Sequence, residues 1–312
     1  MSTAYRTSIT TAPDGTELCT YTWEPKGEPR AIVQIAHGMA EHAGRYDRLA
    51  QRLTDEGYVV YAHDHRGHGG TAIEARDHGY FADEDGWWTV VDDIRAVGAR
   101  AQDEHPGLRR VLLGHSMGSF LSRSYAMKYG DDIDALVLSG TGAGPGLLGK
   151  VGSLIATVES KVRGPRAKST LMNTLSFGEY NKAFKPNRTE FDWLSRDPDE
   201  VDAYIADPLC GEVFTTGFYI DMLGGLDLVN DDKNVARVRS DLPIYLFSGS
   251  MDPVGDAGKG VKAVRAQFER AGVRDVTMRL YPDGRHEMFN EINRDEVTDD
   301  LIDWLEIHLP ST

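Results

Sequence analysis

Residues 111–120 have the sequence Val-Leu-Leu-Gly-His-Ser-Met-Gly-Ser-Phe, in which an apolar run passes into a helix-like segment at Ser116. Gly114 and Gly118 stand two positions before and two positions after this serine. A sharp strand-to-helix turn crowds the backbone at such positions, so residues without a Cβ are favoured there. The pattern predicts that Ser116 projects from the end of a sheet, where its hydroxyl can act as a nucleophile.

Apolar strands alternate with amphipathic helical patterns on both sides of this segment. The predicted strands are residues 5–11, 17–23, 31–36, 58–62, 110–113, 133–139, 242–248 and 276–281. Continuous apolar strands separated by helices form parallel sheets that are covered on both faces. We therefore predict an α/β fold with a mostly parallel sheet of eight strands, opened by an antiparallel hairpin.

The alternation stops between residues 141 and 240, where two helix-like apolar patterns occupy residues 147–162 and 213–228. We interpret this interval as a helical cap, inserted after the sixth strand. The predicted domains are a core of residues 1–140 and 241–312 and a cap of residues 141–240.

The first helical pattern of the cap carries an apolar stripe. Its members are Leu147, Leu148, Val151, Leu154, Ile155 and Val158. The preferred interpretation is that the stripe packs the cap onto the core. The alternative is that part of it lines an acyl channel or makes transient contact with a lipid surface.

The charge balance excludes some classes of partner. The 312 residues include 34 basic and 49 acidic side chains, a formal net charge of −15, and no basic stripe of the kind that binds nucleic acid is visible. Residues 1–12 lack the pattern of a signal peptide, and no apolar run is long enough to span a membrane, so we expect a cytoplasmic protein. Cys19 and Cys210 are expected to be free thiols. The oligomeric state stays open.

Asp252 and His286 are the expected partners of Ser116, because a serine nucleophile needs a base and a group that orients the base. In open α/β sheets, reactive groups collect beyond the carboxyl ends of the strands. Asp252 follows the predicted strand 242–248, and His286 follows the strand 276–281. The chain order serine, aspartate, histidine is that of an α/β-hydrolase triad.

Neighbouring residues offer alternatives for these roles. Asp256 lies further along its loop and Asp283 is three residues from the histidine, so Asp252 is preferred to both. His115 lies inside the turn, where its side chain should point away from the serine hydroxyl. The segment 64–69, Asp-His-Arg-Gly-His-Gly, matches no zinc-ligand spacing, so we interpret it as a structural turn and expect no metal.

Two backbone amides are expected to bind the oxyanion that forms when a carbonyl is attacked. One is the amide of Met117, which follows the serine at the positive end of a helix. The other is the amide of Met39, because His37 and Gly38 permit a tight turn after the strand 31–36.

Four motifs carry a likeness to a known family. They are His37-Gly38-Met39-Ala40-Glu41-His42-Ala43-Gly44-Arg45-Tyr46, Asp64-His65-Arg66-Gly67-His68-Gly69, Gly114-His115-Ser116-Met117-Gly118 and Gly284-Arg285-His286-Glu287. Together they resemble the monoacylglycerol lipase and lysophospholipase branch of the α/β-hydrolases, also called serine aminopeptidase S33-like hydrolases. The resemblance covers nearly the whole chain.

The resemblance implies an α/β-hydrolase fold and a triad of Ser116, Asp252 and His286, with an oxyanion hole formed by the amides of Met39 and Met117. It also implies that Glu41 and Arg45 lie close to the polar end of the substrate site.

From the residues and the resemblance together, we predict a serine hydrolase that cleaves carboxylic esters through an acyl-enzyme. The expected substrates are monoacylglycerols or lysophospholipids, and no cofactor is expected. One alternative is a general short-chain carboxylesterase or thioesterase. Another, from a different class, is a ligand-binding homologue without turnover.

Overall fold

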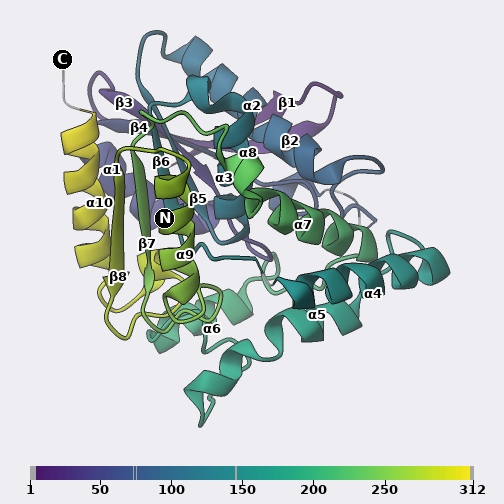
Figure 1. The fold of residues 1–312 in the computed structure, drawn as a ribbon. Helices are drawn as coiled ribbons and strands as arrows, with labels where there is room; N and C mark the ends of the chain where they lie inside the picture. The colour runs from purple at the N-terminus through teal and green to yellow at the C-terminus, as the bar shows by residue number, and fades with distance from the viewer. Residues whose placement is uncertain (1–4, 73, 75, 145, 310–312) are drawn as a thin grey trace.

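An eight-stranded sheet forms the centre of the structure, a computed structural model that describes residues 5–72, 74, 76–144 and 146–309 (Figure 1). The strand order is β1-β2-β4-β3-β5-β6-β7-β8. The strands are β1 (Arg6–Thr11), β2 (Glu17–Trp23), β3 (Ala31–Ala36), β4 (Tyr58–His63), β5 (Arg110–His115), β6 (Ala135–Ser139), β7 (Ile244–Gly249) and β8 (Val276–Tyr281). β2 pairs antiparallel with β1 and β4, and the remaining pairs are parallel. The predicted fold class is confirmed.

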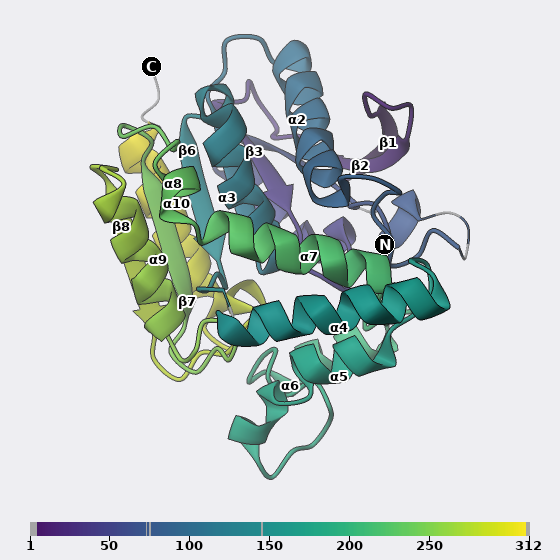
Figure 2. The ribbon, with the colours of Figure 1, turned by 45° about the vertical axis from the view of Figure 1, so that its right-hand side comes forward.

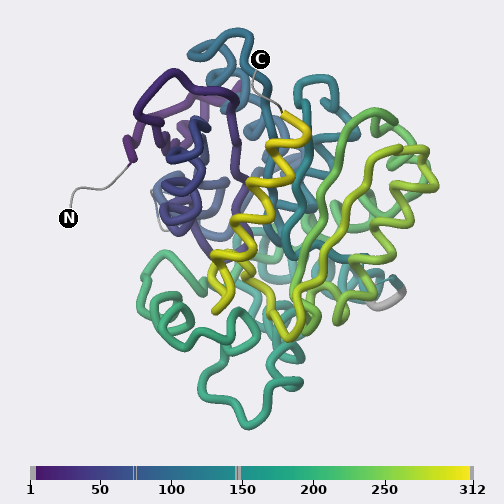
Figure 3. The backbone as a smooth tube through the Cα atoms, turned by 90° about the vertical axis from the view of Figure 1, so that its left-hand side faces the viewer, coloured from purple at the N-terminus to yellow at the C-terminus, as the bar shows by residue number. Residues whose placement is uncertain are grey.

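Helices cover both faces of the sheet. One face is covered by α1 (Asp47–Asp55) and α10 (Arg294–His308), and the other by α2 (Gly86–Glu104), α3 (Met117–Tyr129) and α9 (Lys259–Arg270) (Figures 2 and 3). Strands β3 to β7 are therefore buried along their whole length, which explains their nearly continuous apolar sequences.

The chain between β6 and β7 is helical. It contains α4 (Leu147–Arg163), α5 (Thr170–Phe177), α6 (Pro198–Ala206), α7 (Thr216–Val229) and α8 (Asp232–Val235). Figure 2 shows α4 and α7 side by side across one end of the sheet, with α5 and α6 beyond them. α7 packs directly on α2 of the core. The backbone at Gly225 lies so close to the ring of Trp87 that a Cβ at this position would overlap the ring. We use the word cap for residues 141–240, whose status as a domain stays a prediction.

No helix in the described part of the chain is both long enough and apolar enough to cross a bilayer.

Four buried histidines, His37, His63, His65 and His68, lie in and after the ends of β3 and β4. Nε2 of His37 accepts a hydrogen bond from the backbone N–H of His65 at 2.9 Å, which leaves Nδ1 to donate to the carbonyl of Gly38 at 2.7 Å. Burial lowers the pKa of His63 to about 3 and that of His68 to about 4, and it holds the pKa values of His37 and His65 well below the usual value. All four rings are therefore neutral at pH 7.

Acid should destabilise the fold through these rings. Below pH 6.5 the unfolded chain binds protons on histidines that stay neutral in the folded state, so each contributes a loss of up to about 1.4 kcal/mol per pH unit. Urea unfolding at pH 7, 6 and 5 measures the effect, and His63→Leu should show a weaker dependence than the wild type. Equal unfolding free energies at pH 7 and pH 5 in the wild type would contradict this expectation.

Candidate active site

Ser116 stands at the turn from β5 into α3. Its φ of 52° is a left-handed value that residues with a side chain rarely adopt. A Cβ on Gly114 would overlap the hydroxyl of Ser122, and a Cβ on Gly118 would overlap the carbonyl of Ala36. The two glycines are therefore required by close packing, and the turn raises Ser116 above the end of the sheet.

His286 and Asp252 meet beyond the carboxyl ends of β8 and β7. Nδ1 of His286 lies 2.9 Å from Oδ1 of Asp252. The hydroxyl of Ser248 donates to Oδ2 of the same carboxylate at 2.7 Å, and the amide of Val254 donates to Oδ1 at 2.9 Å. These bonds orient the imidazole with Nδ1–H toward Asp252, so Nε2 is left as the basic nitrogen.

Burial and charge act in opposite directions on this pair. Burial alone would lower the pKa of His286, but the carboxylate of Asp252 and its hydrogen bond raise that pKa above its usual value of 6.5. Burial alone would raise the pKa of Asp252, but the imidazole and the hydroxyl of Ser248 lower it. Asp252 is therefore ionised at neutral pH, and His286 can accept a proton there.

Residues 37–42, which we name the oxyanion loop, pass beside the serine. A Cβ built on Gly38 would lie 3.2 Å from Cβ of Ser116, and Gly38 and Met39 line the same cavity as Ser116. Met117 is the first residue of α3, where backbone amides have no acceptor within the helix. This placement suits the amides of Met39 and Met117 as oxyanion donors, a role that stays a prediction.

A cavity of about 80 Å³ lies over Ser116. Residues of the core line one side, and aromatic residues of the cap, among them Phe177, Trp193 and Tyr204, line the other. The volume holds a few water molecules, whereas sites for larger ligands commonly reach several hundred Å³. A long acyl chain would therefore require side chains of the cap to shift.

Glu41, Arg45 and Glu287 form a buried ionic network at one edge of this cavity. Oε1 of Glu41 accepts from the amide of Gly38 at 2.6 Å and from the hydroxyl of Tyr46 at 2.8 Å, while Oε2 accepts from Arg45 at 2.7 Å. Arg45 also binds both carboxylate oxygens of Glu287 at 2.7 Å. Burial alone would raise the pKa of Glu287, but the guanidinium of Arg45 lowers it to about 2.

These bonds engage Glu41 and Arg45, which the resemblance placed close to the polar end of the substrate site. Their contacts are those of residues that position the oxyanion loop, and direct contact with a substrate stays a prediction. Glu287 was not singled out by sequence analysis, although it directly follows His286 in one of the four motifs.

Sequence analysis also missed Trp193, which lies in the cap beside the base. Its ring centroid is 5.1 Å from that of His286, and its carbonyl accepts from the amide of His286 at 3.3 Å. The available signal was a short group of apolar residues, Phe191, Trp193 and Leu194, within a polar segment.

Asp64 organises the segment that was interpreted as a structural turn. Its Oδ1 accepts from the amide of Ala43 at 2.8 Å, and its Oδ2 accepts from the amide of Gly70 at 2.7 Å and from the hydroxyl of Tyr21 at 3.1 Å. The carboxylate thus ties three parts of the chain together beneath the oxyanion loop. His115, the rejected base, is buried with Nδ1 3.1 Å from the hydroxyl of Ser139.

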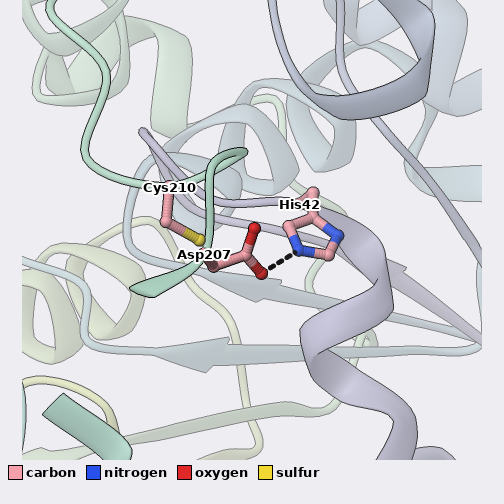
Figure 4. Close-up of side chains that lie close together, drawn as sticks. All are labelled: His42, Asp207 and Cys210. Atoms are coloured by element: carbon pink, nitrogen blue, oxygen red, sulfur yellow. Dashed lines mark hydrogen bonds and ion pairs between the residues drawn. The ribbon is translucent and has the colours of Figure 1, made fainter. Parts of the chain in front are cut away.

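One group in the described residues brings three potential metal ligands together: His42, Asp207 and Cys210 (Figure 4). Their donor atoms lie within 4.8 Å of one another. Nε2 of His42 and Oδ2 of Asp207 are 2.9 Å apart and bond each other, so two of the three donors are already engaged. We interpret the group as a contact between the oxyanion loop and the cap.

The arrangement has the parts that acyl transfer requires. Ser116 supplies a hydroxyl, His286 a base, Asp252 the carboxylate that orients the base, and the first turn of α3 a positive end for a developing oxyanion.

Comparisons with known proteins match nearly the whole chain. The family model described as "Serine aminopeptidase, S33" matches residues 27–293. A monoacylglycerol lipase of Mycolicibacterium smegmatis is 33% identical over 291 residues, which cover 92% of each chain. The monoglyceride lipase of Homo sapiens is 30% identical over 288 residues, which cover 89% of this chain and 82% of that relative. The crystal structure of a thermostable carboxyl esterase from Bacillus coagulans matches with a TM-score of 0.91 at 27% identity, covering 98% of this chain and 99% of that one.

Ser116 should react with a fluorophosphonate at a rate that rises with pH through a midpoint above 6.5, because neutral His286 is required. Asp252→Asn should slow the reaction by about 10⁴-fold and move the midpoint to lower pH, since it removes the charge that raises the pKa of His286. Asp283→Asn, which alters an exposed carboxylate nearby, should change the rate less than about twofold. Pseudo-first-order labelling rates between pH 5 and pH 9 test this, and equal losses in the two variants would refute the assignment of Asp252.

Proposed function

The chain belongs to the serine aminopeptidase S33 family of α/β-hydrolases and is a carboxylic ester hydrolase, and we propose that it cleaves monoacylglycerols through an acyl-enzyme on Ser116. The observation that carries this proposal is the convergence of three strand ends. Ser116 follows β5, Asp252 follows β7 and His286 follows β8, with the imidazole and the carboxylate 2.9 Å apart.

The proposed reaction has two steps. Oγ of Ser116 attacks the ester carbonyl while Nε2 of His286 takes its proton, and the imidazolium then protonates the departing glycerol oxygen. The carbonyl oxygen carries negative charge between these events and accepts hydrogen bonds from the amides of Met39 and Met117. Water, deprotonated by His286, cleaves the acyl-enzyme and releases the fatty acid.

The charge at the polar edge of the cavity supports an uncharged head group. Glu41 and Glu287 contribute two carboxylates against the one guanidinium of Arg45, so the network is negative overall. A glycerol hydroxyl can bond such a surface, whereas the phosphate of a lysophospholipid would meet repulsion. The names of the relatives in Mycolicibacterium smegmatis and Homo sapiens support the same choice.

A general short-chain carboxylesterase is the second candidate. The observation that favours it is the small cavity, about 80 Å³, over Ser116. The carboxyl esterase from Bacillus coagulans, whose structure was solved in complex with glycerol, has the same fold. The two candidates share the chemistry and differ only in how the cap accommodates the acyl chain.

An apolar face of the cap supports contact with lipid. Exposed side chains on α4 and α5, which we name the apolar cap face, are Val151, Leu154, Val158, Val162, Leu171 and Leu175. Ile155 and Ala156 lie on the other side of α4 and pack against the core. Packing onto the core therefore explains that side of the helix, but not the exposed side chains. The preferred interpretation of the stripe was therefore wrong for its exposed members, and the side chains of Leu147 and Leu148 lie outside the described residues. We propose that this face makes transient contact with lipid surfaces.

Ser116→Ala should abolish ester hydrolysis while the protein remains folded, as judged by circular dichroism. In the wild type, kcat/KM should be higher for 1-monoacylglycerols of medium and long chain than for methyl esters of the same acids, because only the former place hydroxyls at the ionic network. Equal values for the two series would favour the general esterase. Activity within tenfold of the wild type in Ser116→Ala would remove the proposed mechanism, and an unreactive, folded wild type would favour a ligand-binding homologue.

Replacing Leu154 and Val158 together by serine should reduce hydrolysis of dispersed long-chain monoacylglycerol by about tenfold, because apolar area is lost from the apolar cap face. Hydrolysis of a soluble short ester should be unchanged. Ile307→Ser on α10, where the side chain is 74% exposed, is the matched control and should affect neither substrate. Equal losses on both substrates in the double variant would contradict a role in lipid contact.

A further inference from the structure

We propose that the cap holds the oxyanion loop in its working conformation, so that movement of the cap turns the oxyanion hole on or off. The inference rests on the proposed function, since it takes the amide of Met39 as an oxyanion donor. The contacts come from three residues, which we name the cap junction: Tyr204 on α6, and Asp207 and Gly211 in the segment after α6.

Ala40 is the strained point of the oxyanion loop. Its φ is 60°, a left-handed conformation that costs a residue with a Cβ more than it costs glycine. Such a conformation persists only where surrounding contacts hold it. Because Ala40 directly follows Met39, the position of Met39 beside Ser116 depends on this turn.

The cap supplies the contacts that hold Ala40. The carbonyl oxygen of Ala40 accepts one hydrogen bond from the hydroxyl of Tyr204 at 2.9 Å and a second from the amide of Gly211 at 3.0 Å. The Gly211 amide is shared, since it also lies 3.1 Å from the hydroxyl of Tyr204. Tyr204 is buried, with its ring against Phe191 and the guanidinium of Arg45 4.9 Å from its centroid.

A second link joins the same two segments. His42, at the end of the oxyanion loop, pairs with Asp207 at 2.9 Å, and Figure 4 shows the two side chains approaching each other from the loop and from the cap. The amide of Cys210 donates to the carbonyl of Asp207 at 3.1 Å, which fixes the turn that leads to Gly211.

The core anchors the other side of Met39. Oε1 of Glu41 accepts from the amide of Gly38 at 2.6 Å. Met39 therefore lies between one residue held by the core and one residue held by the cap. Tyr204 also lines the cavity over Ser116, so whatever displaces Tyr204 within the cavity also removes one of the two hydrogen bonds that hold the carbonyl of Ala40.

Tyr204→Phe tests the coupling, because it removes the hydroxyl and keeps the ring. We expect kcat on a soluble short ester to fall by about fivefold to thirtyfold. This is the factor by which the loss of one or two hydrogen bonds shifts an equilibrium between the working and the non-working conformation of the oxyanion loop. KM should change less than about twofold, since an oxyanion donor acts only on the transition state. Tyr219→Phe is the matched control. Tyr219 is also buried in the cap, but its hydroxyl donates to Asn173, which belongs to the cap, at 3.4 Å. The kcat of this variant should equal that of the wild type.

Two inhibitors separate positioning from general loosening of the cap. Ser116 attacks a trifluoromethyl ketone, its proton passes to His286, and the carbonyl oxygen becomes an oxyanion in the hole. A methyl ketone of the same chain binds without attack. In Tyr204→Phe the inhibition constant of the trifluoromethyl ketone should rise by the same factor by which kcat falls, and that of the methyl ketone should not move.

Ala40→Gly supplies the rescue. Glycine adopts the left-handed turn without the cost that a Cβ imposes, so Ala40→Gly combined with Tyr204→Phe should recover at least about threefold of the lost kcat. A Tyr204→Phe variant that matches Tyr219→Phe, or one that raises KM at constant kcat, would overturn the coupling. Activity in Ser116→Ala would overturn the proposed function instead, so the two failures are distinguishable.

Discussion

The turn at Ser116 depends on a close approach of three backbone segments. Gly114 lies against the carbonyl of Gly118, and Gly118 lies against the carbonyl of Ala36 at the end of β3. Since Ala36 and Gly114 are register partners in the sheet, this approach brings the oxyanion loop beside Ser116. Asp252 and His286 are brought to the same place by the sheet, because the parallel strands β7 and β8 end at the same edge. The chemistry of the site is thus set by how closely α3 can pack on β3 and β5.

The ionisable groups around this turn are buried, and each is either neutral or paired. His286 pairs with Asp252, Arg45 pairs with Glu41 and Glu287, and the buried imidazoles beneath the oxyanion loop are held neutral. In a site of low dielectric an unpaired charge would be costly, whereas fixed dipoles and paired charges act strongly on a developing oxyanion. The same burial lowers the pKa values of the surrounding imidazoles, whereas the Asp252 carboxylate raises that of His286.

Several features of the fold could be predicted from sequence because they depend on local patterns. β2, β3 and β8 have the predicted bounds, and the spacing of Gly114 and Gly118 around Ser116 identifies the turn. The helices of the cap were harder to predict from sequence. α5 and α6 are short, with nine residues or fewer, and they begin at the side-chain caps of Ser169 and Asp197 rather than at a long apolar period. The contact of Trp193 with His286 spans more than ninety residues of sequence. The resemblance placed Glu41 and Arg45 close to the polar end of the site, but it did not indicate the ion pair of Arg45 with Glu287.

The helices of the cap leave the sheet after β6 and return to it at β7, and these two strands are parallel neighbours paired from Leu136 and Ile244 to Ser139 and Phe247. The sheet therefore closes without any contribution from the intervening hundred residues. α7 is constrained by its packing on Trp87, and α6 is constrained by the bond from Tyr204 to the oxyanion loop, whereas α4 and α5 present exposed faces that no such contact among the described residues restrains. The connection is thus a point at which chain can be exchanged: α4 and α5 can change in length or composition while the strands that lead to Ser116, Asp252 and His286 keep their pairing.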